Sequence, residues 1–200
     1  MANAIKAFNS IINDISLNQD RYLARFNFSA CELWLCTEIC YLLNFKDTYG
    51  ISTKDNEFAY NEDCKRDISF YNDAESTTLS DHIEVKVVYP NGKYRVTSKN
   101  NWLDNLLNKL NHSKMDAPLQ VNHHGWVFGV WTSDERYTKH FSTPEDFFKK
   151  DYDLIHARLV EKHSSPSSFK YVDIMDDTLM WRGIEKRIVV KGFQFTRSAK

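Results

Sequence analysis

Three residues in the first half of the chain have side chains that together could bind a divalent metal and act on a phosphate ester. Asp67 opens the run D-I-S-F-Y, and after sixteen intervening residues Glu84 and Lys86 stand in I-E-V-K-V. Hard cations such as Mg²⁺ take carboxylate oxygens and keep several waters, so one or two protein carboxylates are enough. A metal held there would lower the pKa of a bound water, and the lysine would stabilise charge that develops on the phosphate.

Both segments have the composition of β-strands, and a turn-rich stretch, N-D-A-E-S-T-T-L-S, separates them. Because side chains of a strand alternate between faces, Glu84 and Lys86 share one face, and the isoleucine and valines beside them take the other. With the turn centred near Thr77, Asp67 is expected roughly opposite Lys86. The sequence therefore predicts two carboxylates and an ammonium on the polar side of a sheet whose other side is apolar.

This pattern resembles the PD-(D/E)XK nuclease superfamily, which has the restriction-endonuclease-like fold. The resemblance rests on Asp67 and on the E-V-K triplet at 84–86, each placed in a β-favouring run. Arg66 stands where the family usually has a proline before the first Asp. The match covers mainly residues 29–89, and the order of the later elements agrees with it.

The resemblance implies a DNA-cleaving enzyme that uses Mg²⁺ or Mn²⁺. Asp67 and Glu84 would bind the metal, and Lys86 would orient the attacking water or stabilise the pentacovalent charge. Members of the superfamily often carry a Glu on the helix before the core hairpin, turned toward the same metal. The resemblance therefore implies Glu38 as an auxiliary ligand and a member of the catalytic group.

The helix that carries Glu38, over residues 28–45, is the strongest helix pattern in the chain. Ser29 fits an N-cap with Glu32 three residues later, and this capping box explains Glu32 without any catalysis. Glu38 has apolar neighbours one turn away, and a buried, unpaired carboxylate is costly. Glu38 is therefore expected to face a metal or a charge. The alternative is a position at the rim, paired with a surface Lys or Arg.

Hydrophobic periodicity and turn residues divide the whole chain into helices and strands. Helices are expected over 3–15, 19–27, 28–45, 101–110 and 144–162, and strands over 57–61, 67–71, 82–89, 93–97, 125–132, 169–175 and 188–195. Asp176 and Asp177 are expected to form a turn. This order predicts an α/β fold with a central mixed β-sheet flanked by α-helices, in agreement with the restriction-endonuclease-like order.

Two hundred residues suffice for a single domain with a proper core. We expect one restriction-endonuclease-like domain, with N-terminal helices over 1–45, a catalytic core over about 46–162 and C-terminal strands with a basic segment over 163–200. The net charge is −1, but residues 181–200 carry six basic residues against one acidic residue. This basic segment could track phosphates, or it could protect an edge strand from aggregation.

The four cysteines indicate a reduced, cytoplasmic protein. Three of them share the helix over 28–45, where they look like small core residues. Cys36 and Cys40 could be half of a zinc site, but no second pair has ligand spacing. There is no apolar stretch of about 18 residues, no secretory h-region and no glycine-rich phosphate loop. We therefore expect no membrane segment and no nucleotide cofactor.

Histidines offer two further candidate sites. The Asp-His pair at 81–82, with Asn101 and His112, superficially resembles the HNH (ββα-metal) nuclease pattern, but the spacing from Asn101 to His112 is off and the Cys pairs of such domains are absent. His123 and His124 are adjacent, so in an extended chain they point in opposite directions and cannot easily bind one metal. Loop histidines are the favoured interpretation there.

Two other functions stay open beside the nuclease. The same fold could serve as a catalytically inactive DNA- or protein-binding subunit. In either case a homodimer or a partner subunit could supply the grip on DNA that 200 residues leave little room to build. Alternatively, the chain is an unrelated α/β domain whose D…E-x-K pattern is coincidental, because charged residues are common on the solvated face of a strand.

Overall fold

Six β-strands and five α-helices make up the part of the chain that this computed structural model describes, residues 2–27, 31–45, 58–61, 67–71, 79–90, 122–162 and 171–197. The strands are β1 (Phe58–Asn61), β2 (Ile68–Tyr71), β3 (Leu79–Val88), β4 (Asn122–Thr132), β5 (Val172–Trp181) and β6 (Ile184–Arg197). The helices are α1 (Ala2–Leu17), α2 (Gln19–Phe26), α3 (Glu32–Phe45), α5 (Glu135–Thr138) and α6 (Pro144–Lys162).

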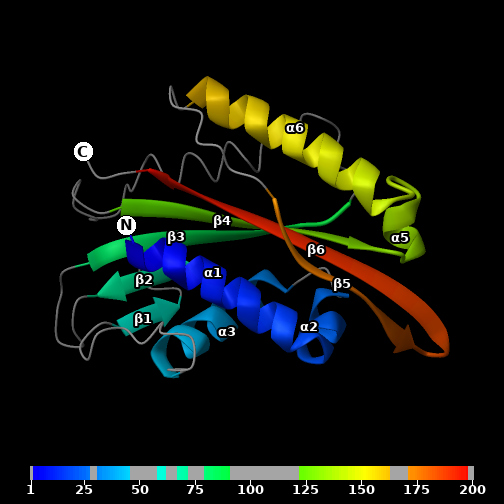
Figure 1. Cartoon of the computed structure of the whole chain (residues 1–200), viewed down its shortest axis with the longest axis horizontal. Helices are drawn as coiled ribbons and strands as arrows, with labels where there is room; N and C mark the ends of the chain where they lie inside the picture. The colour runs from blue at the N-terminus through cyan, green and yellow to red at the C-terminus, as the bar shows by residue number, and fades with distance from the viewer. Residues whose placement is uncertain are drawn as a thin grey trace.

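The six strands form one sheet in the order β1-β2-β3-β4-β6-β5 (Figure 1). β3 and β4 pair in parallel, and every other neighbouring pair in this sheet is antiparallel. Antiparallel strands can follow each other through short turns, whereas a parallel pair requires a longer crossover connection. The sheet is therefore mixed, and the predicted α/β class with a central mixed sheet flanked by helices is confirmed.

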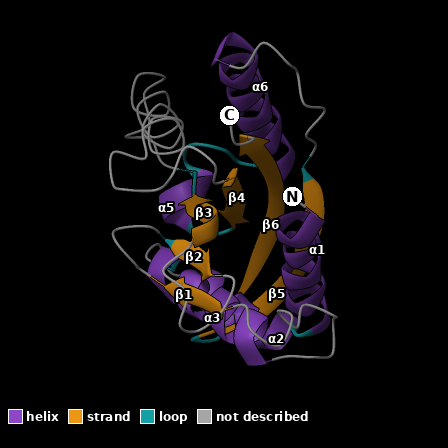
Figure 2. Cartoon of the chain, turned by 90° about the vertical axis from the view of Figure 1, so that its left-hand side faces the viewer, coloured by secondary structure: helices purple, strands orange, loops and turns teal. Residues whose placement is uncertain are grey.

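Strand β4 shows how the helices are divided between the two faces of the sheet. Trp126 and Phe128 pack in the core cluster that contains α1, α2 and α3, whereas Val127 and Trp131 pack with Phe147 of α6. Because neighbouring side chains of a strand point to opposite faces, α1–α3 cover one face and α6 covers the other (Figure 2). A strand segment covered on both faces is expected to be apolar, as residues 125–131 of β4 are.

Most of the predicted elements are confirmed within a few residues. The helices expected over 3–15, 19–27 and 144–162 correspond to α1, α2 and α6, and most of 28–45 forms α3. The single turn α5 was not predicted. It begins after Asp134, whose carboxylate accepts a hydrogen bond from the backbone nitrogen of Arg136 at 3.0 Å. The helix expected over 101–110 and the strand expected over 93–97 lie outside the described residues.

The turn predicted at Asp176 and Asp177 is wrong, because both residues lie within β5. The reversal of the chain occurs instead at Arg182 and Gly183, with φ angles of 51° and 77°. Positive φ at both central residues matches the right-handed twist of the two strands that they connect. Asp176 is held in the strand by a two-pronged ion pair with Arg187 of β6, with N–O distances of 2.8 and 2.7 Å.

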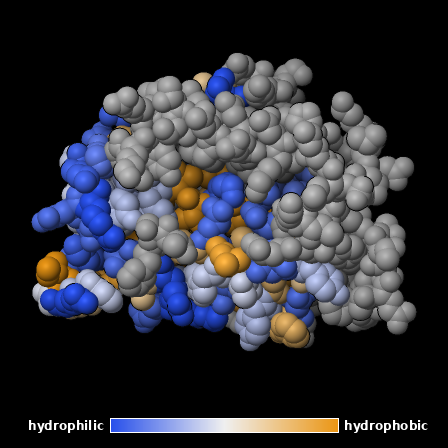
Figure 3. Space-filling view, turned by 180° about the vertical axis from the view of Figure 1, so that it is seen from behind, coloured by the Kyte–Doolittle hydropathy of each residue, from blue (hydrophilic) through white to orange (hydrophobic). Residues whose placement is uncertain are grey.

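The basic C-terminal segment is partly neutralised within the fold. Lys186 lies 3.5 Å from Asp134, Arg187 pairs with Asp176, and Lys191 lies 2.6 Å from Asp173. These pairs leave less free positive charge for a phosphate backbone than the sequence count indicates. Seen from behind, much of the described surface is hydrophilic, with separate apolar residues (Figure 3). None of the described helices combines the length and apolar character needed to cross a membrane.

Candidate active site

Strand β3 places Glu84 and Lys86 on the same face of the sheet, as predicted. The residues between and before them, Ile83 and Val85, are fully buried on the opposite face against α1–α3. Val88, two positions beyond Lys86, packs in the cluster that contains α6. Glu84 and Lys86 therefore lie on the face of the sheet that α6 also covers.

Asp67 is the residue directly before β2, and its side chain reaches β3. The register pairs Ile68 with Ile83, so the chain passes Asp67 beside Glu84 and not opposite Lys86. The register shifts at Phe70 and Tyr71, an irregularity that the sequence pattern did not reveal. The Asp67 carboxylate nevertheless leans along β3 and accepts a hydrogen bond from the backbone nitrogen of Val85 at 2.8 Å.

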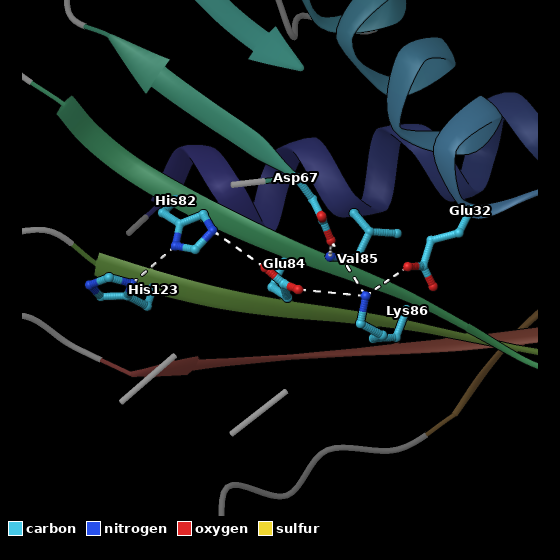
Figure 4. A network of polar contacts seen from close by, with 7 residues as sticks. All are labelled: Glu32, Asp67, His82, Glu84, Val85, Lys86 and His123. Carbon is cyan, nitrogen blue, oxygen red and sulfur yellow. Dashed lines mark hydrogen bonds and ion pairs between the residues drawn. The ribbon is translucent and has the colours of Figure 1, made fainter. Parts of the chain in front are cut away.

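The Lys86 ammonium joins the two predicted carboxylates (Figure 4). Its Nζ lies 3.5 Å from Glu84 Oε1 and 3.8 Å from Asp67 Oδ2. The side chain of Glu84 is only 1% exposed, whereas those of Asp67 and Lys86 are 16% and 20% exposed. The structure therefore brings together Asp67, Glu84 and Lys86, with Glu84 at the bottom of the group and the other two nearer the surface.

Glu32 is a fourth member of this group, which sequence reasoning assigned to helix capping. It is the first residue of α3, and its Oε1 lies 2.7 Å from Lys86 Nζ (Figure 4). Its Oε2 accepts a hydrogen bond from the backbone nitrogen of Val87 at 3.0 Å. Ser29, the expected partner in a capping box, lies outside the described residues. No local signal distinguishes the two roles of Glu32, because the contact depends on where α3 begins relative to β3.

The carboxylates of Asp67 and Glu32 bind the backbone of β3 where it extends past the first residue of β2. The pairing with β2 begins at Ile68 and Ile83, and the backbone nitrogens of Val85 and Val87 lie beyond it. A buried backbone N–H group needs a hydrogen-bond acceptor. Each of these two receives one from a carboxylate, so Asp67 and Glu32 have a structural role whatever their chemistry.

The pKa of Lys86 lies above its ordinary value. Burial alone would lower it, but the hydrogen bond to Glu32 and the negative charges of Glu32, Asp67 and Glu84 outweigh that effect. Lys86 is therefore a protonated ammonium at neutral pH and cannot accept a proton. In this arrangement it can stabilise developing negative charge, and it is not suited to act as a general base.

Glu38 does not join this group. It lies six residues after Glu32, which turns it by roughly 240° around the helix axis. Its buried carboxylate forms an ion pair with Arg21 of α2. This pairing with a half-exposed arginine corresponds to the alternative that the sequence left open, a rim position paired with a surface Lys or Arg. Among the described residues, no contact joins Glu38 to Asp67 or Glu84.

The histidines that were expected in a loop lie in a strand instead. His123 and His124 are buried near the start of β4 and point in opposite directions, as adjacent strand residues must. His124 lies 3.2 Å from Asp81 Oδ1 and 2.9 Å from Thr196 Oγ1, whereas His123 contacts His82. Asn101 and His112, which completed the HNH-like pattern, lie outside the described residues.

The donor set of this group fits a hard divalent cation. Asp67 and Glu84 offer two carboxylates within 4 Å of one Lys86 nitrogen, and Mg²⁺ or Mn²⁺ needs only one or two protein carboxylates beside water and phosphate. Among the described residues, no group of three or more His, Cys, Asp and Glu side chains is arranged so that it could hold a metal ion. Cys36 and Cys40, the possible half of a zinc site, are buried free thiols of α3, and burial raises the pKa of Cys40 to about 12 and that of Cys36 also above its usual range.

Comparison with known proteins yields no relative of this chain. No protein-family model, no curated protein and no solved structure matches it significantly.

Proposed function

We propose that this protein is a metal-dependent nuclease of the restriction-endonuclease-like fold that hydrolyses phosphodiester bonds in DNA. The single observation that carries the proposal is the position of Lys86 Nζ within 4 Å of both Asp67 and Glu84. Glu84 and Lys86 come from β3, and Asp67 directly precedes β2, so two neighbouring segments of the sheet supply the group. Three buried free thiols, at Cys31, Cys36 and Cys40, support a reducing compartment such as the cytoplasm.

Each residue of the group would have a distinct role. Asp67 and Glu84 would hold Mg²⁺ or Mn²⁺, which when bound supplies an activated water and neutralises the phosphate. As the water oxygen attacks phosphorus and the bond to the leaving sugar oxygen breaks, negative charge grows on the non-bridging oxygens. Lys86, held protonated by its three carboxylate neighbours, would stabilise that charge. Glu32 would hold the ammonium in place.

Cleavage assays with supercoiled and linear DNA, with Mg²⁺ or Mn²⁺, test the proposal. The wild-type protein should nick or cut DNA, and Lys86→Ala should lose this activity. Lys139→Ala is the control, because Lys139 is an exposed lysine after α5 and lies outside both the Lys86 group and the basic segment over 181–200. Absence of cleavage of every DNA and RNA form tested, together with absence of Mn²⁺ binding by calorimetry, would overturn it.

A second candidate function is a catalytically inactive DNA- or protein-binding subunit. The observation that favours it is that Asp67 and Glu32 already accept hydrogen bonds from the backbone of β3. Lys86 already neutralises part of the negative charge, so the group is stable without a metal. Retention of intact DNA by the wild-type protein, with no turnover under any divalent metal, would select this function over the nuclease.

A further inference from the structure

Two buried histidines continue the polar group away from Lys86. His82 lies two residues before Glu84 on the same face of β3, and His123 is its partner in the parallel register with β4. Their exposed fractions are 4% and 3%, and their Nδ1 atoms lie 3.2 Å apart. On the other side of the ring, His82 Nε2 lies 3.7 Å from Glu84 Oε2 (Figure 4). The atoms thus form a row from His123 through His82 to Glu84.

The contact between the two Nδ1 atoms, together with the nearby Glu84 carboxylate, favours one of the two neutral tautomers of His82. Between neutral imidazoles one Nδ1 must donate and the other must accept. If His82 Nδ1 donated, its Nε2 would direct a lone pair at the Glu84 carboxylate, which is unfavourable. If His123 Nδ1–H donates, His82 carries its proton on Nε2 and directs an N–H group at Glu84. The second arrangement satisfies both contacts.

The Glu84 carboxylate is almost fully buried, so a nearby N–H group can stabilise its charge and fix its orientation. Glu84 pairs with Gly125 of β4, which in turn pairs with Phe195 of β6. A Cβ atom on Gly125 would lie 2.4 Å from the Phe195 ring, so the ring packs directly on the glycine backbone. The apolar ring of Phe195 therefore lies on the β4 side of this polar group. Lys86 lies next to Oε1 of Glu84, and His82 lies next to Oε2.

We propose that His82, with its tautomer fixed by His123, is a positioning residue that holds the Glu84 carboxylate ready for a divalent cation. This inference rests on the proposed function, because it assigns Glu84 as a metal ligand. His82 Nε2 is buried and makes no hydrogen bond, so its N–H group is available to Glu84 after a shift of less than an ångström. A donor that orients a metal-binding carboxylate typically changes metal affinity about 10–100-fold.

Mn²⁺ titration of four proteins tests the role of His82. His82→Leu removes the donor at similar volume and should weaken Mn²⁺ binding about 10-fold or more. His82→Gln places an amide nitrogen near the position of Nε2 and should recover affinity to within about 3-fold of wild type. His124→Leu is the matched control, because His124 is equally buried one strand away but faces Asp81 and Thr196. It should bind Mn²⁺ as the wild type does. Equal affinity of His82→Leu and wild type would overturn the proposal.

The tautomers of the imidazoles, measured by long-range ¹H–¹⁵N NMR, distinguish failure of the positioning role of His82 from failure of the proposed nuclease function. We expect the Nε2–H tautomer for His82 and the Nδ1–H tautomer for His123. The Nδ1–H tautomer at His82 would overturn the positioning role even if the wild type binds Mn²⁺. If the wild type binds no Mn²⁺, the metal-dependent function fails and the role of His82 toward a metal fails with it, whichever tautomer His82 has.

Discussion

The carboxylate of Glu32 and the ammonium of Lys86 lie 2.7 Å apart although 54 residues separate them in the chain. Glu32 begins α3 and Lys86 lies near the end of β3, so this contact fastens the first turn of the helix to the edge of the sheet. A negative side chain in the first turn of a helix is itself favourable, because it faces the positive end of the helix dipole. The candidate site is thus built where a helix begins beside the part of β3 that extends past β2.

Lys86→Met should separate metal binding from cleavage. Methionine keeps the length of the side chain but removes the charge that stabilises the transition state, so cleavage should fall about 100-fold or more. Mn²⁺ affinity should be retained or increase, because the ammonium no longer competes for Asp67 and Glu84. Single-turnover cleavage and calorimetric titration measure the two effects. Parallel loss of metal binding would argue that Lys86 only holds the site together.

Replacing Glu32 should reveal whether its charge or its hydrogen bond matters. Glu32→Gln keeps an oxygen for the backbone of Val87 but removes the charge beside Lys86. Thermal stability should therefore change little, while the pKa of Lys86 should fall toward its ordinary value. Glu32→Ala should in addition reduce the free energy of unfolding by about 1 kcal/mol, because the N–H of Val87 loses its acceptor. Equal stability of the two variants would contradict the edge-capping role.

Arg21→Ala tests the assignment of Glu38 to a structural ion pair. The substitution leaves a buried carboxylate without its cation and should lower the free energy of unfolding by about 1–3 kcal/mol in urea titrations. Arg21→Ala combined with Glu38→Gln should recover part of this loss, since the amide carries no charge. Metal affinity should be unchanged in both proteins. Weaker Mn²⁺ binding in the double variant alone would return Glu38 to the metal site.

Gly125→Ala tests the close packing beside Glu84. The new Cβ would lie 2.4 Å from the ring of Phe195, so the ring must move, at a cost of about 1–3 kcal/mol. Combining it with Phe195→Leu should cost less than the two single effects added together, because the smaller side chain relieves the clash. Urea unfolding of the four proteins provides the double-mutant cycle. Additive effects would show that the two positions do not interact.

Three thiols should resist modification in the folded protein. Burial raises the pKa of Cys31 to about 11 and of Cys40 to about 12, and that of Cys36 also rises. A Cys64→Ser variant, which lacks the fourth cysteine, should therefore react with a thiol reagent at about pH 8 only after denaturation, since the thiolate is the reactive form.

The raised pKa values of the three buried thiols also determine how stability should change with pH. The unfolded chain releases these protons first as pH rises above about 8.5, so the free energy of unfolding should fall from there toward about pH 12.

The extent to which the sequence anticipated the site differs from residue to residue. Asp67, Glu84 and Lys86 could be grouped because strand periodicity and one turn relate them locally. The register was predicted two residues too far, because the composition of the segment that connects the two strands does not fix where the centre of the turn lies. Helical periodicity indicated that Glu38 lies among apolar residues, but it could not tell a metal from the arginine of another helix.

Alternation and helical periodicity, which act over a few residues, let the sequence by itself determine the helices, most strands and the shared face of Glu84 and Lys86. The tertiary structure decided which carboxylate of α3 meets Lys86, how His82 reaches His123, and that Arg187 and Lys191 face aspartates. These relationships depend on how whole elements dock across the sheet. Docking is set by the packing of many apolar side chains at once, and no short segment of the chain records it.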